Sequence, residues 1–229
     1  MSDLIDTTEM YLRTIYELGE EGVPPLRARI AERLAQSGPT VSQTVARMER
    51  DGLLAVLDDR QIELSPAGHE LAVRVMRKHR LAERLLTDVI GLSLPQAHAE
   101  ACRWEHVISE AVEHRLVDVL NSPTASPYGN RIPGLAEVGG TDVPERRWPS
   151  LASVLADVAD GDGRRVTVEM LTEHAQSDAD LLGLLTDAGV VPGAEVEARI
   201  EGDRLALRPA ATAGCTVELG VAEHLFVSA

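Results

Sequence analysis

The stretch from Gln36 to Leu53 decides the fold, and it reads QSGPTVSQTVARMERDGL. Ser37 is typical of a turn, and Pro39 suits the first turn of a helix that follows it. Apolar residues recur at helical spacing in this helix and predict a buried stripe. The buried stripe consists of Val41, Val45 and Met48, and a polar stripe on another face consists of Gln43, Arg47 and Arg50. The pattern predicts an amphipathic helix that ends at Gly52.

The segments around this helix complete an order of elements. Asp6, with a glutamate three residues later, forms a capping box that predicts a helix from about Thr7 to Glu20. A second helix is expected from about Leu26 to Ala35. The strands of a short hairpin with a charged tip are expected at Leu53–Val56 and Gln61–Leu64. Helix, helix, turn, helix and hairpin is the order of a winged helix-turn-helix.

The rest of the chain predicts a helical middle and a β-rich end. Two long helices are expected over residues 65–90 and 93–121, each begun by a serine that can cap it. Residues 122–149 are rich in proline and glycine, which predicts an ordered loop that grades into a linker. The β-rich segments beyond it are Arg165–Glu169, Glu195–Ile200, Leu205–Arg208 and Cys215–Leu219, with a short helix at about Asp178–Ala188. The expected fold is therefore mainly α, with a β wing and a small β-barrel domain.

The charge of the chain is unevenly distributed. The 229 residues carry a formal net charge of -15, which by itself argues against nucleic acid as a partner. Residues 1–80, however, hold 11 Lys and Arg against 13 Asp and Glu, so most of the excess acid lies downstream. Residues 27–50 hold five arginines against two glutamates. The segment with the predicted polar stripe is therefore expected to have a basic face, although the whole chain is acidic.

The composition and the first residues of the chain also indicate the cellular compartment. The hydrophobic fraction of 44% is ordinary for a globular protein, and no stretch approaches the roughly 20 apolar residues of a membrane span. The acidic start of the chain lacks the pattern of a signal peptide, so a cytoplasmic protein is expected. The two cysteines, Cys102 and Cys215, are too few for a disulfide framework. Packing or thiolate chemistry must account for Cys102.

A cluster of metal-ligand residue types lies in the second long helix of the middle part. At helical spacing its members project within about 100° of arc. They are His98, Cys102, Glu105 and His106. The preceding helix carries His79 and Glu83 four residues apart, and the thioether of Met10 would soften a site that it joined. The alternative reading is an amphipathic helix that shows this polar face to solvent.

The polar stripe of the helix after Pro39 suits DNA. The amide of Gln43 can read a base edge, and neighbouring hydroxyls with Arg47 can contact phosphates. The alternatives are an ordinary solvated face and a winged helix that binds protein. Enzyme signatures are missing, because the sequence has no His-Glu-x-x-His, no phosphate-binding Gly-x-x-x-x-Gly-Lys loop and no Gly-x-Ser-x-Gly.

These residues make a family recognisable. Much of the chain up to Leu135 closely resembles the iron-dependent repressors of the diphtheria toxin repressor family, specifically the three-domain actinobacterial regulators. The segments that carry the resemblance are Asp6–Tyr16, Arg27–Leu34, Gln36–Leu53, Met76–Leu86 and His98–His106. It implies a DNA-binding domain over residues 1–73, a dimerisation and metal domain over 74–140, a linker over 141–149 and an SH3-like domain over 150–229.

The resemblance also implies two metal sites and an anion site. The primary metal site would comprise Met10, Cys102, Glu105 and His106, with the backbone carbonyl of Cys102. The ancillary metal site would comprise His79, Glu83 and His98, completed by Glu173 and Gln176 of the third domain. The anion site would comprise Arg80, Ser126 and Asn130. The family thus assigns His98 and Cys102 to separate sites, although helical spacing groups them on one face.

What the resemblance implies for function is an Fe²⁺-activated homodimeric repressor. It would bind inverted-repeat operators of iron uptake, siderophore and iron storage genes, with two Fe²⁺ per subunit and one or two dimers per operator. Co²⁺, Ni²⁺, Zn²⁺ and Mn²⁺ are substitutes to expect in vitro. The residues expected to meet bases are Ser37, Pro39 and Gln43, and those expected to hold phosphates are Arg27, Thr40, Ser42, Arg47, Arg50 and Arg60.

Two rival functions stay open at this point. A manganese-responsive regulator of the same fold is one, although such relatives have Asp and Glu where this chain has Met10 and Cys102. Soft ligands favour Fe²⁺ over the harder Mn²⁺. The other rival is a zinc hydrolase built on His79, Glu83 and His98, for which the sequence suggests neither a base nor a substrate cleft.

Overall fold

The computed structural model describes residues 6–159 and 161–228. The chain forms two compact units, each of which draws on separate stretches of sequence. The first unit comprises the residues up to 82 together with 102–122 and 132–142. The second unit comprises 83–101, 123–131 and the residues from 143 onward. Among the described residues, no helix combines the length and the apolarity needed to cross a membrane.

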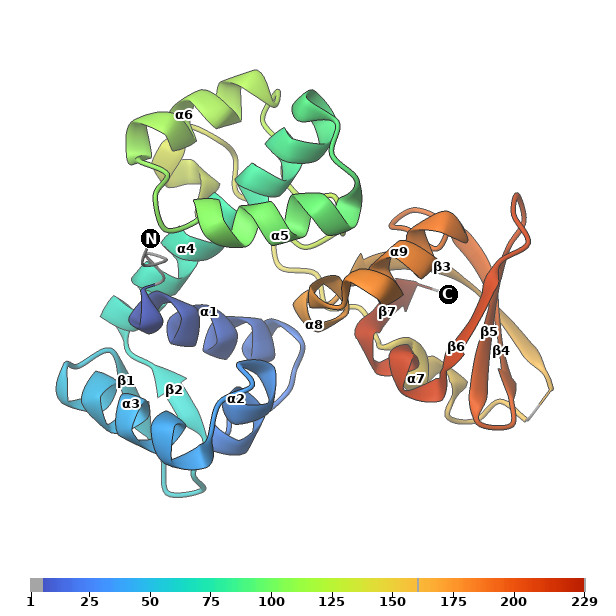
Figure 1. Cartoon of the computed structure of the whole chain (residues 1–229), viewed down its shortest axis with the longest axis horizontal. Coiled ribbons are helices and arrows are strands. Elements are labelled where there is room, and N and C mark those ends of the chain that lie inside the picture. Colours follow the sequence, from blue (N-terminus) through green and yellow to red (C-terminus); the bar gives the residue numbers. More distant parts are fainter. Residues whose placement is uncertain (1–5, 160, 229) are drawn as a thin grey trace. The chain divides into compact units, whose positions relative to one another are not determined.

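The N-terminal part of the first unit has the predicted winged helix-turn-helix order (Figure 1). Its elements are α1(Thr7–Glu20), α2(Arg27–Arg33), α3(Gly38–Arg50), β1(Leu54–Val56) and β2(Ile62–Leu64). Asp6 accepts hydrogen bonds from the backbone amides of Thr8 and Glu9 and so begins α1. Ser37 caps α3 by accepting from the amide of Thr40. The predicted apolar stripe of α3 is fully buried, in one core with α1.

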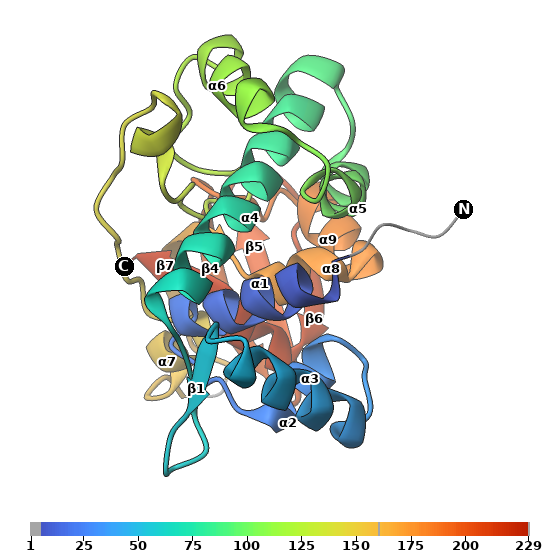
Figure 2. The same ribbon diagram turned by 90° about the vertical axis from the view of Figure 1, so that its left-hand side faces the viewer.

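The hairpin forms the wing of this domain. Strands β1 and β2 pair antiparallel, with Leu54 opposite Leu64. The amide of Val56 donates to the carboxylate of Glu49 at 3.0 Å, which ties the wing to α3. In Figure 2 the tip of the hairpin projects away from α2 and α3. Arg60 stands at this exposed tip with a φ of 70°, so the predicted charged wing is confirmed.

The helical middle begins with α4(Pro66–Leu85), which continues into the π-helical turn η1(Leu86–Ile90). In the first unit α4 packs through a buried ion pair between Arg77 and Glu113 at 2.8 Å. Arg77 also donates to the carbonyl oxygen of Gly134 and to Glu137, both at 2.7 Å. The remaining elements of the middle part are α5(Leu94–Trp104), α6(Glu110–Val119) and η2(Leu135–Val138).

The prediction of one helix over residues 93–121 is wrong. The structure ends α5 at Trp104 and begins α6 at Glu110. Ser109 interrupts the helix because it takes extended backbone at the N-terminal cap of α6. Serine favours such positions over helix interiors. Glu105 and His106 therefore lie in a turn after the helix that carries Cys102.

The second unit is built on an antiparallel five-stranded sheet of the SH3-like kind, with strand order β6-β5-β4-β3-β7. Its strands are β3(Gly163–Leu171), β4(Glu195–Glu201), β5(Arg204–Pro209), β6(Cys215–Glu218) and β7(Leu225–Ser228). Its other elements are α7(Leu151–Leu155), α8(Glu173–Ser177), α9(Ala179–Asp187) and η3(Leu219–His224). The predicted strands and the predicted helix are confirmed as β3 to β6 and α9. The sequence patterns missed β7, α7 and α8, which are short.

A loop of the proline-rich segment packs on this sheet. The carbonyl oxygen of Tyr128 accepts from the amide of Leu171 at 2.9 Å, and the Tyr128 hydroxyl donates to the carbonyl of Leu94. Gly129 has a φ of +87°, and a Cβ there would lie 1.9 Å from the backbone oxygen of Glu169. Only glycine allows this approach. The segment is thus ordered here, and it holds Ser126 and Asn130 beside the end of β3.

Candidate metal centre and nucleic-acid interface

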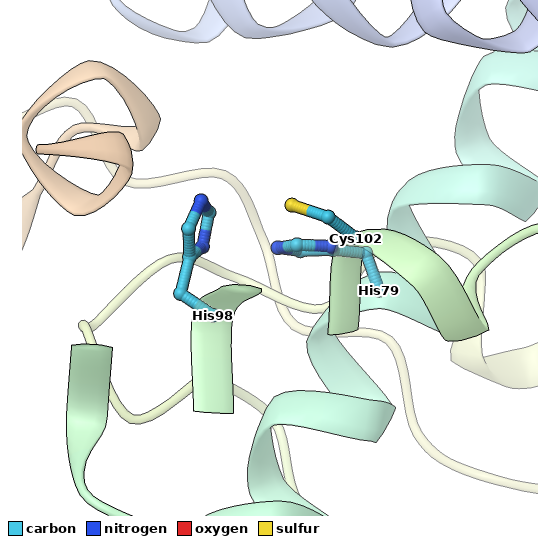
Figure 3. A group of neighbouring side chains, drawn as sticks. All are labelled: His79, His98 and Cys102. Atoms are coloured by element: carbon cyan, nitrogen blue, oxygen red, sulfur yellow. The ribbon is translucent and has the colours of Figure 1, made fainter. Parts of the chain in front are cut away.

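The first cluster of metal-ligand types lies in the first unit, around the turn that follows α5. The carboxylate of Glu105 is buried, with its Oε2 2.7 Å from Nδ1 of His79. Figure 3 shows the thiol of Cys102 beside the ring of His79, and their ligand atoms lie within 4.8 Å of each other. His106 donates from Nδ1 to Glu9 of α1 at 2.5 Å. The structure thus gathers imidazole, carboxylate and thiol donors where α4, α5 and α1 meet.

A cation of the chain itself stands among these donors. The guanidinium of Arg13 donates to Glu105 at 2.7 Å and lies 3.5 Å from Sγ of Cys102. Its Nε donates to Glu17, one turn along α1, at 2.5 Å. Sequence reasoning missed Glu9, Arg13 and Glu17. Their spacing of four residues along α1 is the signal that would have found them.

The protonation states of Glu105 and His106 depend on the charged and hydrogen-bonding groups around them. Burial would raise the pKa of Glu105, but the charge of Arg13 and the hydrogen bond from His79 outweigh it and lower that pKa. The hydrogen bond to Glu9 raises the pKa of His106 against the opposing effect of burial. The cluster therefore presents an ionised carboxylate and an imidazole that binds a proton readily. A metal at His106 must displace that proton, because only neutral imidazole is a ligand.

Met10, the fourth predicted primary ligand, lies half-buried on α1. Its neighbours on the helix, Glu9 and Arg13, are the residues that reach His106 and Glu105. The structure therefore brings Cys102 and Glu105 together and sets the helix of Met10 against the turn that carries Glu105 and His106.

The second cluster lies within the second unit and is fully buried. The ligand atoms of Glu83, His98 and Glu173 all lie within 4.8 Å of one another. Nδ1 of His98 is 3.0 Å from Glu83. His79, the other predicted ancillary ligand, is one turn before Glu83 on the same helix, α4. Figure 3 also labels His98, which lies on α5 one turn before Cys102.

Gln176 supplies a test of whether the second cluster suits a metal. Its Nε2 donates to Oδ1 of Asn130 at 2.9 Å and to the carbonyl of Leu171 at 2.8 Å, which fixes the orientation of the amide. Its Oε1 is then buried and accepts no hydrogen bond from the described residues. A buried amide oxygen without a donor is costly unless a cation meets it. The donor set therefore fits a divalent metal.

The residues predicted for an anion lie in both units. In the second unit the hydroxyl of Ser126 donates to Asn130 at 3.3 Å. In the first unit Arg80 is fully buried and donates to both carboxylate oxygens of Glu20, at 3.1 and 2.6 Å. Any anion at Arg80 would share this guanidinium with Glu20, which sequence reasoning also missed.

The predicted DNA-contacting residues are almost all exposed. Those exposed on α3, at its start and on the wing are Ser37, Pro39, Thr40, Ser42, Gln43, Arg47, Arg50 and Arg60. Arg27, by contrast, is half-buried at the start of α2. Arg47 also donates to the hydroxyl of Thr8 on α1 at 3.5 Å. An exposed polar helix beside a wing that carries an exposed arginine has the geometry of a major-groove reader.

Comparison with known proteins decides the family. Residues 3–62 match the iron dependent repressor N-terminal DNA binding domain, and residues 65–134 match the iron dependent repressor metal binding and dimerisation domain. The iron-dependent repressor IdeR of Mycobacterium tuberculosis is 64% identical over 196 residues, which cover 86% of this chain and 85% of that protein. The chain belongs to the iron-dependent repressor family. Its DNA-binding and dimerisation domains are those of a metal-dependent repressor.

Other iron-dependent repressors and their relatives agree. The diphtheria toxin repressor of Corynebacterium diphtheriae is 59% identical over 201 residues, 86% of each chain. Among solved structures, IdeR of T. acidophilum has a TM-score of 0.73 at 23% identity and covers 97% of this chain and 98% of its own. The manganese regulator SloR has a TM-score of 0.73 at 25% identity, with 96% and 97% covered. These two structures support the fold.

Proposed function

We propose that this iron-dependent repressor is activated by Fe²⁺ and binds, as a homodimer, inverted-repeat operators of iron uptake, siderophore and iron storage genes. The observation that carries the proposal is the contact of α1 with the donor cluster at Glu105 on one side and with the DNA-reading helices on the other. Identity of 64% with a protein named as an iron-dependent repressor supports the choice of metal.

In this proposal the primary metal site consists of Met10, Cys102, Glu105 and His106, with the carbonyl oxygen of Cys102. A bound metal supplies a divalent charge that joins α1 to the turn after α5. Thiolate and thioether donors favour Fe²⁺ over Mn²⁺. The cluster around Glu105 suits a cation, because Arg13 already brings one there.

The ancillary site would hold a second Fe²⁺ through His79, Glu83, His98, Glu173 and Gln176. The lone Oε1 of Gln176 supports this assignment. The anion site would comprise Arg80, Ser126 and Asn130. The domain boundaries at residues 73, 140 and 149 and the cytoplasmic location belong to the same proposal.

The path from metal to DNA would run through α1. On the side of the DNA-reading helices, the hydroxyl of Tyr11 donates to Gln36 at 2.5 Å, in the turn between α2 and α3. Tyr11 is fully buried in the core that α1 shares with α3. A metal shifts an equilibrium only through affinity that differs between two states. Fixing α1 on the donor cluster would provide that difference and set the position of Gln43, Arg47 and the rest of the reading surface.

Dimerisation would use exposed apolar side chains of the segment matched to the dimerisation domain. Five of its large apolar side chains are exposed, three in the first unit (Val107, Val112 and Val119) and two in the second (Val89 and Ile90). Exposed apolar residues in such numbers are typical of a surface that another subunit covers. A dimer presents two reading helices to one palindrome, and an operator would take one or two dimers.

Two alternatives remain to be separated by experiment. An anaerobic mobility-shift assay with an operator fragment should give retardation at lower concentrations of Fe²⁺ than of Mn²⁺. A lower midpoint for Mn²⁺ would favour the manganese-responsive alternative. Binding that needs no metal would contradict activation by a metal, and no operator binding with any of these metals would favour the zinc hydrolase.

A further inference from the structure

Arg13 is shared between two buried carboxylates. Its side chain is 12% exposed, and those of Glu17 and Glu105 are 7% and 2% exposed. The Nε contact to Glu17 and the Nη1 contact to Glu105 use different edges of one guanidinium. A planar fork can make both contacts at once. One monovalent cation therefore serves two carboxylates that belong to different segments.

The guanidinium and a divalent metal need the same atoms. Glu105 Oε2 accepts from Arg13 at 2.7 Å, and Sγ of Cys102 lies 3.5 Å from the same nitrogen. Both residues are proposed primary ligands, whereas Glu17 is not. A metal that takes Glu105 and Cys102 leaves Arg13 with a partner on its own helix. The charges then balance better, because each cation has its own carboxylate.

We propose that Arg13 is the internal counter-cation of the metal-free primary site, which an incoming metal displaces from Glu105 toward Glu17, and that this competition sets the metal concentration at which the repressor switches. The inference rests on the proposed primary site. It predicts opposite effects for the two partners of the ion pair. Removing the guanidinium removes the competitor of the metal, whereas removing the Glu17 charge takes away the carboxylate that draws Arg13 away from Glu105.

The test is an anaerobic Co²⁺ titration of the full chain, read by the Co²⁺–thiolate charge-transfer absorbance, which reports metal at Cys102. Arg13→Gln should lower the Kd by about tenfold, the order of a close charge-pair coupling. Glu17→Gln should raise the Kd. Arg29→Gln is the matched control, because it removes the same charge from an exposed pair with Glu32 (57% and 63% exposed). It should leave the Kd unchanged.

The outcomes separate this inference from the proposed function. No thiolate band in the wild-type chain, or a band that Glu105→Gln leaves unaltered, would overturn the primary site itself. A normal wild-type band with an unchanged Kd in Arg13→Gln would overturn only the role of Arg13. Equal tightening in Arg29→Gln, or tightening in Glu17→Gln, would do the same. Circular dichroism of each metal-free variant checks that it folds.

Discussion

The two donor clusters of this repressor differ in composition and in what surrounds them. The cluster at Glu105 offers a thiol and two imidazoles, and it is shared with charged residues of α1. The cluster at Glu83, His98 and Glu173 offers carboxylates and an imidazole, all buried beside an SH3-like sheet. One cluster is soft and already in contact with an internal cation. The other cluster has harder donors, and its side chains are buried.

This difference indicates which of the two clusters can switch the repressor between its two states. A site that changes state must have two arrangements of similar free energy, and α1 supplies a cation and a proton-binding pair that a metal can replace. A closed cluster whose members are held by the core has one arrangement. We therefore expect the cluster at Glu105 to control DNA binding and the cluster at His98 to add stability.

The largest effect should come from Cys102→Ser. A neutral hydroxyl is a much poorer ligand than thiolate for a borderline-soft cation. The Fe²⁺ midpoint for operator binding should rise by about a hundredfold, since even indirect changes around a metal cost 10- to 100-fold in affinity. An anaerobic mobility-shift titration measures it. Met10→Ala should act in the same direction, and an unchanged midpoint in both variants would show that the soft donors are not the sensor.

Acid should weaken metal binding at the cluster of Glu105. The contact with Glu9 raises the pKa of His106, so below that raised pKa a metal must expel a proton. Each proton expelled costs about tenfold in apparent affinity per unit of falling pH. Co²⁺ titrations read by the thiolate band should show this fall. In Glu9→Gln the fall in metal affinity should begin at a lower pH than in the wild-type chain. Protonation of Cys102 weakens metal binding equally in both proteins. Superimposable pH profiles of the two proteins would therefore exclude the role of Glu9.

A smaller effect should follow from Tyr11→Phe, which tests the link between the first cluster and the DNA-reading helices. The change removes a buried hydroxyl and leaves the Oε1 of Gln36 without this donor. A net hydrogen bond is worth about 1 kcal/mol, or about fivefold in an equilibrium constant. Operator affinity at saturating Fe²⁺ should fall by about that factor, with the Co²⁺–thiolate midpoint nearly unchanged. A shift of the metal midpoint alone would place Tyr11 in metal binding instead.

Local sequence patterns predicted most of the fold, but they did not predict contacts between residues far apart in the sequence. The helix cap at Asp6 and the stripe at Val41, Val45 and Met48 concern neighbours within a helix, and both are confirmed. The break at Ser109 was missed because residues 105–108 contain neither proline nor glycine. Helical spacing groups His98 with Cys102 on one face of α5. The further partners of these two side chains, Glu83 and His79, come from another helix, and spacing within one helix cannot reveal that.

The smallest effect on DNA binding should come from Glu173→Gln in the second cluster. The side chain is 4% exposed on α8, and the substitution keeps its shape while removing the charge that a metal would need. The chain should lose one of two equivalents of bound metal, which calorimetric titration with Co²⁺ would count. The midpoint of the thiolate band should stay where it is, because Cys102 and Glu105 are untouched. Operator binding at saturating Fe²⁺ should weaken by about threefold or less, the range of an indirect packing effect. A loss as large as that of Cys102→Ser would show that the closed cluster is itself the sensor, and the comparison between the two clusters would then be reversed.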